Sequence, residues 1–164
     1  MSERSERRTV HSTFVIERTY AASPPRVWEA WADPAAKTQW FGPPEKPAGA
    51  YSLDFREGGR ERLWGQMPDN GPVHTYDAVY HDIVPGERIV YAYDMHLNEE
   101  RISVSLATVE IEAAGEGTRL TLTEHGVFLD GHDNPAQREH GTNELIDALG
   151  AHLDSRIVRG PERS

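Results

Sequence analysis

The sequence predicts an α+β domain in which a large antiparallel sheet packs against one long C-terminal helix. Between residues 50 and 125, apolar segments rich in β-branched and aromatic side chains alternate with short connections rich in Gly, Pro, Asn and Asp. Connections this short make neighbouring strands antiparallel. The last long segment instead repeats its apolar residues at three- and four-residue steps, which is typical of a helix with one buried face.

The first strand is expected at residues 13–20, where the run TFVIERTY has strand-forming side chains. Two short helices should follow it. Ser23 is suited to cap the first of them, because proline, which suits a first helical turn, comes directly after it. Pro34 begins the second helix, and Gly42 ends it.

Six further strands are predicted, which brings the total to about seven. The alternation of apolar residues in the fifth of these six places Ile102, Val104 and Leu106 on the inner face of the sheet. The alternation changes phase afterwards, so a β-bulge is expected near residues 107–108. The six strands are expected at residues 50–56, 60–67, 73–84, 87–96, 101–112 and 118–125.

The C-terminal helix is expected from about Pro135 to Arg159, and at that length it spans roughly 36 Å, enough to cross a whole sheet. A twisted sheet of this size curls, so a single helix on its concave side should leave a cavity. We therefore predict a flexible N-terminus at 1–11, one domain at 12–159 and a flexible tail at 160–164. The apolar stripe of the helix consists of Leu145, Ile146, Leu149, Leu153 and Ile157.

Composition restricts the function. The formal net charge of −10 argues against a nucleic-acid partner, because phosphate binding needs a basic surface. The chain has no cysteine, which excludes disulfides, thiolate catalysis and cysteine-based zinc sites. Its apolar runs are too short to cross a bilayer, and the charged N-terminus lacks the apolar core of a signal peptide. We expect a cytoplasmic protein without a membrane partner.

The stretch TEHGVFLDGHDN, residues 123–134, contains the side chains used in metal binding and acid–base catalysis. Its two histidines, His125 and His132, are seven residues apart with two glycines between them, and this spacing matches no metal-site pattern. No serine lies in a nucleophile-elbow pattern, and the paired glycines fall in hairpin turns instead of phosphate-binding loops. We therefore expect neither a metal ion nor a cofactor.

Glu124 is the ionisable residue of greatest interest in this stretch. It follows inward-facing leucines at the end of a strand, so burial should raise the pKa of its carboxyl group. Three roles are open: a general base, a hydrogen-bonding anchor for a ligand, or the partner of Arg119 or of an arginine on a neighbouring strand. By alternation, His125 should face solvent.

The same alternation places four tyrosines and a methionine on the inner face of the sheet. Tyrosine combines an apolar ring with a hydroxyl that needs a partner, so these residues could line an amphipathic cavity. They could equally fill the core, or face outward if the alternation is reversed. With Trp64 and Leu149 added, the predicted ligand-binding residues are Trp64, Tyr76, Tyr80, Tyr91, Tyr93, Met95, Glu124 and Leu149.

Several runs in the sequence resemble a known superfamily: FVIERTYAASPPRVWEAWADPAAKTQWFGPP, LDFREGGRERL, YDAVYHDIVPGERIVYAYDM, and GTRLTLTEHGVFLDG followed by a helix with REHG and LIDAL. Over about residues 12–155 the chain is similar to the SRPBCC superfamily. More narrowly, it resembles bacterial members of the family named after the activator of the heat-shock-protein-ninety ATPase. The resemblance implies a helix-grip fold, shared with START domains and the major birch-pollen allergen, with an internal ligand cavity.

The resemblance leaves the function open, because the superfamily includes lipid carriers, hormone receptors, polyketide cyclases and ring-hydroxylase subunits. We expect binding or transport of a small apolar or amphipathic ligand without catalysis. One alternative is a cyclase- or hydrolase-type enzyme that uses Glu124 as its acid–base group, with tyrosine hydroxyls stabilising an enolate or oxyanion. Another is a stress-linked, co-chaperone-like protein-binding module. A homodimer is possible in each case.

Overall fold

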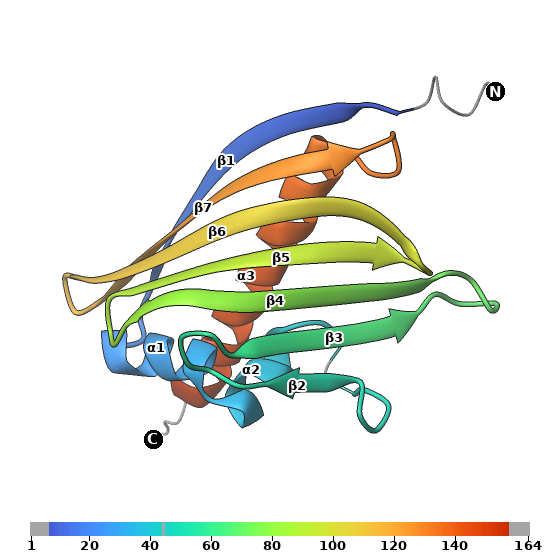
Figure 1. Cartoon of the computed structure of the whole chain (residues 1–164). Coiled ribbons are helices and arrows are strands. Elements are labelled where there is room, and N and C mark those ends of the chain that lie inside the picture. Colours follow the sequence, from blue (N-terminus) through green and yellow to red (C-terminus); the bar gives the residue numbers. More distant parts are fainter. Residues whose placement is uncertain (1–6, 44, 158–164) are drawn as a thin grey trace.

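The computed structural model describes residues 7–43 and 45–157. Its seven strands form one antiparallel sheet in the order β1-β7-β6-β5-β4-β3-β2, and three helices lie on one side of it (Figure 1). The strands are β1 Thr9–Tyr20, β2 Tyr51–Leu53, β3 Arg60–Gln66, β4 Val73–Val84, β5 Arg88–Leu97, β6 Glu100–Ala114 and β7 Gly117–Leu129. The helices are α1 Pro24–Ala32, α2 Pro34–Trp40 and α3 Pro135–Ile157.

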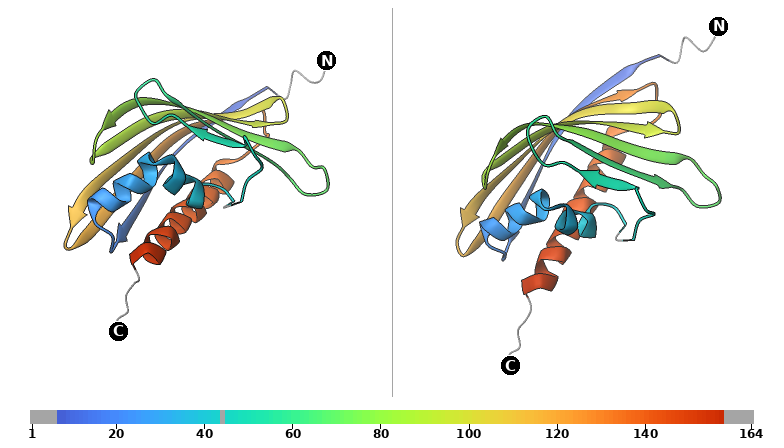
Figure 2. Two further views of the ribbon diagram at one scale, coloured as in Figure 1. Left: turned by 90° about the horizontal axis from the view of Figure 1, so that it is seen from below. Right: turned by 60° about the horizontal axis from the view of Figure 1, so that its bottom comes forward.

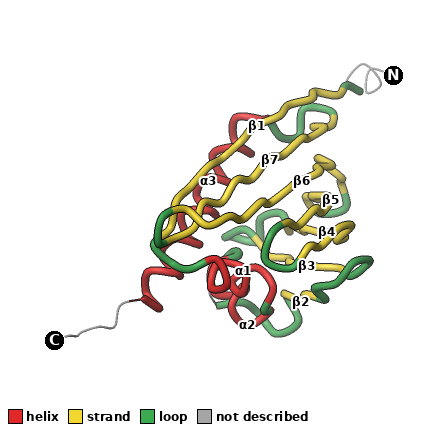
Figure 3. Tube along the Cα trace, turned by 90° about the vertical axis from the view of Figure 1, so that its left-hand side faces the viewer, coloured by secondary structure: helices red, strands yellow, loops and turns green. Residues whose placement is uncertain are grey.

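The sheet curves around α3, which runs along its concave side (Figures 2 and 3). Helices α1 and α2 lie on the same side and pack against α3. The predicted α+β architecture is therefore confirmed: seven antiparallel strands, two short helices after the first strand and a long C-terminal helix. This is the arrangement of a helix-grip fold, in which one helix alone covers much of the inner face of a wide sheet.

Strand β1 begins at Thr9, earlier than the sequence predicts. Residues 9–11 pair with residues 127–129 of β7. Asp130 holds this end of the strand, because its carboxylate accepts a 2.8 Å hydrogen bond from the backbone N–H of Arg8 and its own N–H donates to the Arg8 carbonyl. Of the segments predicted to be flexible, residues 1–6 and 160–164 lie outside the described residues.

The two short helices begin where the sequence predicts, and both have a side-chain cap. The Ser23 hydroxyl accepts a hydrogen bond from the N–H of Arg26 at the start of α1. Asp33 ends α1 and caps α2 by accepting from the N–H of Ala35 at 3.2 Å. Because Asp33 serves both helices, α2 begins directly where α1 ends, with no further residue between them.

The predicted inner face of β6 is wrong for Val104 and Leu106, whereas Ile102 is buried as predicted. Val104 and Leu106 are 39% and 44% exposed, on the convex side of the sheet, whereas Ser103 and Ser105 are buried. Pairing with β5 and β7 is regular through residues 107–108, so the predicted bulge is not there. The pairing of β5 with β6 is instead irregular at Ile102, because Met95 pairs with Ser103 and His96 pairs with Arg101. Ile102 is therefore an extra residue in β6. Ile102 and Ser103 are both buried, and the alternation is shifted from that point on.

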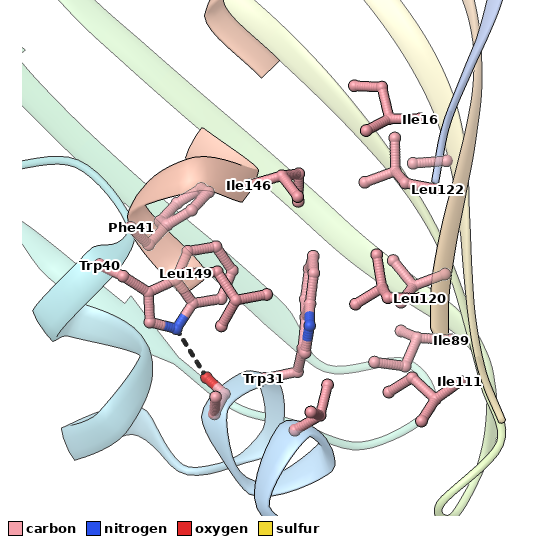
Figure 4. Packing of buried hydrophobic residues seen from close by; sticks show 14 of the residues in the cluster. Ile16, Trp31, Trp40, Phe41, Ile89, Ile111, Leu120, Leu122, Ile146 and Leu149 are labelled. Carbon is pink, nitrogen blue, oxygen red and sulfur yellow. Dashed lines mark hydrogen bonds between the residues drawn. The ribbon is translucent and has the colours of Figure 1, made fainter. Parts of the chain in front are cut away.

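Two tryptophans from the short helices close one end of the fold. The rings of Trp31 and Trp40 pack edge to face, with centroids 4.9 Å apart, and Trp40 Nε1 donates to the Ala30 carbonyl at 3.0 Å. Trp31 points into the space between α3 and the sheet (Figure 4). The buried face of α3 contributes Ile146, Leu149 and Leu153. The first turns of α3 lie away from this packing and border a cavity instead.

Candidate functional site

Two adjoining cavities form the candidate site, which we call the cleft. One, of about 510 Å³, lies between the first half of α3 and the ends of β4, β5 and β6. The other, of about 690 Å³, lies between β3, β4 and the loop after α2. His74, Tyr76 and Met95 border both cavities, so the two adjoin at these residues.

Aromatic and aliphatic side chains form most of the wall of the cleft. The Tyr76 ring lies at its centre, 4.9 Å from Phe41 and 4.8 Å from Tyr93 between ring centroids. Met95 pairs with Tyr76 across β4 and β5, and Leu145 contributes the wall from α3. A surface of this kind suits the apolar body of a small molecule.

Arg138 of α3 provides the polar end of the cleft. Its Nη2 donates to Asp133 Oδ2 at 2.6 Å and to Ser103 Oγ at 2.9 Å, and its Nη1 donates to the Tyr93 hydroxyl at 3.3 Å. The guanidinium group also lies 5.7 Å from the ring centre of Tyr93 and 5.2 Å from that of Phe128. The inward-facing serine of β6 thus serves as a partner for this arginine.

Glu124 lies beneath Tyr93. Its carboxylate accepts a 2.5 Å hydrogen bond from the Tyr93 hydroxyl. Burial raises the pKa of the Glu124 carboxyl, as the sequence predicts, although the hydrogen bond from Tyr93 and the charge of Arg138 oppose the shift. Of the three roles left open for Glu124, the pairing with Arg119 does not form, because Arg119 binds Glu112 at 2.7 Å. The cation that acts on Glu124 comes from the helix instead of a strand.

His125, next in the chain, is exposed as predicted. Its Nδ1 lies 2.9 Å from the Thr13 hydroxyl of β1, on the convex face of the sheet. It therefore takes no part in the cleft. His132, the other histidine of the segment, borders the cleft, so the stretch of residues 123–134 has one histidine on the convex face of β7 and one, beyond the end of β7, at the cleft.

The predicted ligand-binding residues fall into two groups. Four of them border the cleft: Trp64, Tyr76, Tyr93 and Met95. Trp64 lies at its rim, because it alternates along β3 with Leu63, the residue that pairs with Tyr76. The other four are buried and border neither cavity: Tyr80, Tyr91, Glu124 and Leu149.

A second buried polar cluster was missed by the sequence reasoning. Lys37 of α2 forms a salt bridge with Glu61 of β3, with Nζ 2.9 Å from Oε2 and both side chains fully buried. The hydroxyls of Tyr51 and Tyr80 donate to the Glu61 carboxylate at 2.6 and 2.7 Å. The Phe41 ring contacts both Lys37, at 4.5 Å, and Tyr76, so it joins this cluster to the wall of the cleft.

The Lys37 ammonium group lies among aromatic rings, with the Trp31 centroid at 5.1 Å and those of Trp40, Tyr80 and Tyr91 at 5.9 Å. Burial lowers the pKa of Lys37, although the charge of Glu61 opposes the shift. The signals in the sequence were slight: Lys37 is one helical turn from Trp40, and Glu61 shares a strand face with Leu63.

The described part of the chain offers neither a cluster of metal ligands nor a membrane-spanning helix. Within residues 7–43 and 45–157, no three His, Asp or Glu side chains gather in a way that could hold a metal ion. None of the described helices is long and apolar enough to cross a membrane.

Solved structures with the same fold include two that are close in sequence. A protein from Rhizobium leguminosarum, described as uncharacterized, is 47% identical, with a TM-score of 0.86 over 91% of this chain and 98% of its own. The Mll3558 protein from Rhizobium loti is 45% identical, with a TM-score of 0.80 over 88% and 99%. DynU16, a protein from the dynemicin biosynthetic locus, shares the fold at 20% identity, with a TM-score of 0.64 over 87% and 47%.

None of the curated proteins matches the sequence. A family match, by contrast, covers most of the chain: residues 21–154 match the family described as Activator of Hsp90 ATPase homolog 1-like protein. The matched range runs from the end of β1 through most of α3 and includes every residue of the cleft named above. The chain therefore belongs to the family of Activator of Hsp90 ATPase homolog 1-like proteins.

Proposed function

We propose that this protein binds a small, largely apolar molecule in the cleft between the sheet and α3, and that it acts as a carrier or receptor for that molecule. The observation that carries the proposal is the cleft itself. Its two cavities, of about 510 and 690 Å³, have the size of ligand pockets in proteins, which is about 300–1,000 Å³. Its wall is mainly aromatic and aliphatic, with polar groups gathered at one end.

The position of Glu124 favours binding over catalysis. A general base has to come within hydrogen-bonding distance of the proton that it removes. The Glu124 carboxylate does not border either cavity, and the Tyr93 hydroxyl, its hydrogen-bond donor, lies between it and the cleft. The cyclase- or hydrolase-type reaction that the sequence suggested would therefore need this residue to be uncovered first.

Gly141 offers a way to close the cleft without disturbing the core. It lies on α3 at the border of the 510 Å³ cavity, and a Cβ at this position would meet no atom within 4 Å. The Gly141→Phe substitution would place a ring in the cleft. Gly141→Ala is the matched control, because it also replaces the helical glycine and adds little volume.

The test uses the neutral fluorescent probe N-phenyl-1-naphthylamine, titrated against the wild-type protein and both variants. We expect the wild type and Gly141→Ala to bind the probe with similar Kd, and Gly141→Phe to bind it at least about tenfold more weakly. Failure of the wild type to bind, or equal binding by Gly141→Phe, would refute the proposal. Native mass spectrometry of protein purified from its own host would then identify the natural ligand.

A further inference from the structure

We propose that the molecule bound in the cleft carries a carboxylate, and that Arg138 holds this group while the apolar body of the ligand lies against Tyr76 and Met95. The inference rests on the proposed function and narrows it to one class of ligand. It follows from the hydrogen-bond donors gathered at one end of the cleft, and from the way in which the sheet holds Arg138.

Several side chains that can donate hydrogen bonds gather at this end. The side chains that border the 510 Å³ cavity include the Arg138 guanidinium, the Gln137 amide and the two imidazoles of His74 and His132, all of which can donate. Tyr76 borders the same cavity, and its hydroxyl makes no hydrogen bond to any described residue. This hydroxyl is therefore free to donate to an acceptor on a bound ligand.

Acceptors with full charge are scarce there. Among the described residues that line this cavity, Asp133 is the one carboxylate. Its Oδ2 accepts from Arg138 at 2.6 Å, and its Oδ1 accepts from the backbone N–H of Asn134 at 2.8 Å. In a chain with a formal net charge of −10, the lining of this cavity thus carries one cation, one anion and two histidines, and the Glu124 carboxyl lies beneath it, behind Tyr93. An anionic ligand meets little repulsion there.

Arg138 is already in position for such a ligand. Its side chain is only 10% exposed, and hydrogen bonds to Ser103 and Tyr93 fix the guanidinium from the side of the sheet. The planar group therefore keeps one orientation, and a carboxylate can bind it without a further loss of side-chain entropy. The ligand carboxylate would share the guanidinium with Asp133 or take its place.

A pair of probes that differ only in charge tests this inference. Isothermal titration calorimetry at pH 7 would compare 2-naphthoate with 2-naphthamide, which has the same ring system and no charge. We expect the wild type to bind the naphthoate at least about tenfold more tightly than the amide. Equal binding of the two probes would overturn the inference and leave the proposed function intact, since that function needs only the neutral probe to bind and Gly141→Phe to weaken its binding.

Two variants test whether Arg138 causes the preference for the naphthoate over the amide. Asp133→Asn removes the competing carboxylate and keeps the arginine, so it should raise the ratio of naphthoate to amide affinity several-fold; an unchanged or lower ratio would contradict the inference. Arg138→Gln should bring the ratio close to one, with the amide affinity unchanged. Arg119→Gln is the matched control, because Arg119 pairs with Glu112 away from the cleft, and it should retain the wild-type ratio. Asp133→Asn keeps the test decisive if Arg138→Gln does not fold.

Discussion

Lys37 Nζ lies 2.9 Å from Glu61 Oε2 in a salt bridge that joins α2 to β3 with both side chains fully buried. Removing two charges from water costs several kcal/mol for each ion, so this pair persists because each charge compensates the other and because two tyrosine hydroxyls complete the carboxylate's hydrogen bonds. The pair holds α2 against the sheet. Phe41 packs against both Lys37 and Tyr76, so it connects the pair to the wall of the cleft.

Breaking this pair from one side should be far more damaging than removing both charges. We expect Lys37→Met to lower the free energy of unfolding by about 3–5 kcal/mol, because it leaves the Glu61 charge buried without a partner. The double variant Lys37→Met/Glu61→Gln should lose less than the sum of the two single variants, since the amide that replaces the carboxylate is neutral and its oxygen can still accept from Tyr51 and Tyr80. Urea unfolding of the wild type, both single variants and the double variant measures the coupling. Additive losses would contradict this account.

Glu124 should make stability depend on pH. Burial raises the pKa of this carboxyl in the folded state, so the folded protein retains a proton that the unfolded chain releases. The charged Glu124 carboxylate therefore lowers the free energy of unfolding. This effect is absent below the unfolded-state pKa of about 4.3, grows as pH rises from there through the folded-state pKa, and is constant above the folded-state pKa. Relative to Glu124→Gln, the wild type should lose stability over this range, with a slope of at most about 1.4 kcal/mol per pH unit.

Urea unfolding of the wild type and Glu124→Gln at a series of pH values measures this difference. Tyr93→Phe provides a second check, because it removes the hydrogen bond that lowers the pKa of Glu124. In that variant the loss of stability should extend to higher pH. A stability difference between wild type and Glu124→Gln that does not change with pH would show that Glu124 titrates as it does in the unfolded chain.

Local pattern predicted the fold and part of the cleft. Alternation placed Tyr76 and Tyr93 correctly because the tyrosines of β4 and β5 all lie on one face of their strands. It failed in β6, because the inner face there carries Ser103 and Ser105, which serve Arg138 from a distant helix, while apolar Leu106 faces outward. The sequence shows the hydrophobicity of a residue but not the distant partner that makes a polar residue acceptable in the core.

The Lys37–Glu61 pair was missed for the same reason. Lysine and glutamate are normally exposed, and neither residue has a local feature that marks it as buried. The two come together only when α2 docks against β3 and the aromatic rings close around them. The role of Arg138 was also missed, since it depends on contacts with residues of β5 and β6 that are far from Arg138 in the sequence.

The turn before β3 should tolerate no side chain at Gly59. A Cβ there would lie 2.0 Å from the Asp54 carbonyl oxygen and 2.9 Å from that of Arg56. Both atoms belong to the backbone, so the hairpin would have to shift, and we expect Gly59→Ala to lower the free energy of unfolding by about 1–3 kcal/mol. Gly65→Ala is the matched control in β3, because a Cβ at that position meets nothing within 4 Å. Urea unfolding should place Gly65→Ala within about 0.5 kcal/mol of the wild type.

Two truncations in β6 test the corrected orientation of this strand. Val109 is fully buried on the concave face, whereas Leu106 is 44% exposed on the convex face. We expect Val109→Ala to cost about 2 kcal/mol, because it removes two buried methyl groups and leaves a space in the core. Leu106→Ala removes a larger side chain and should nevertheless cost less than about 1 kcal/mol, since the lost atoms are partly in water already. The orientation predicted from the sequence alone, with Leu106 inward, requires the truncation of Leu106 to be as costly as a core truncation, so urea unfolding of the two variants decides between the two orientations.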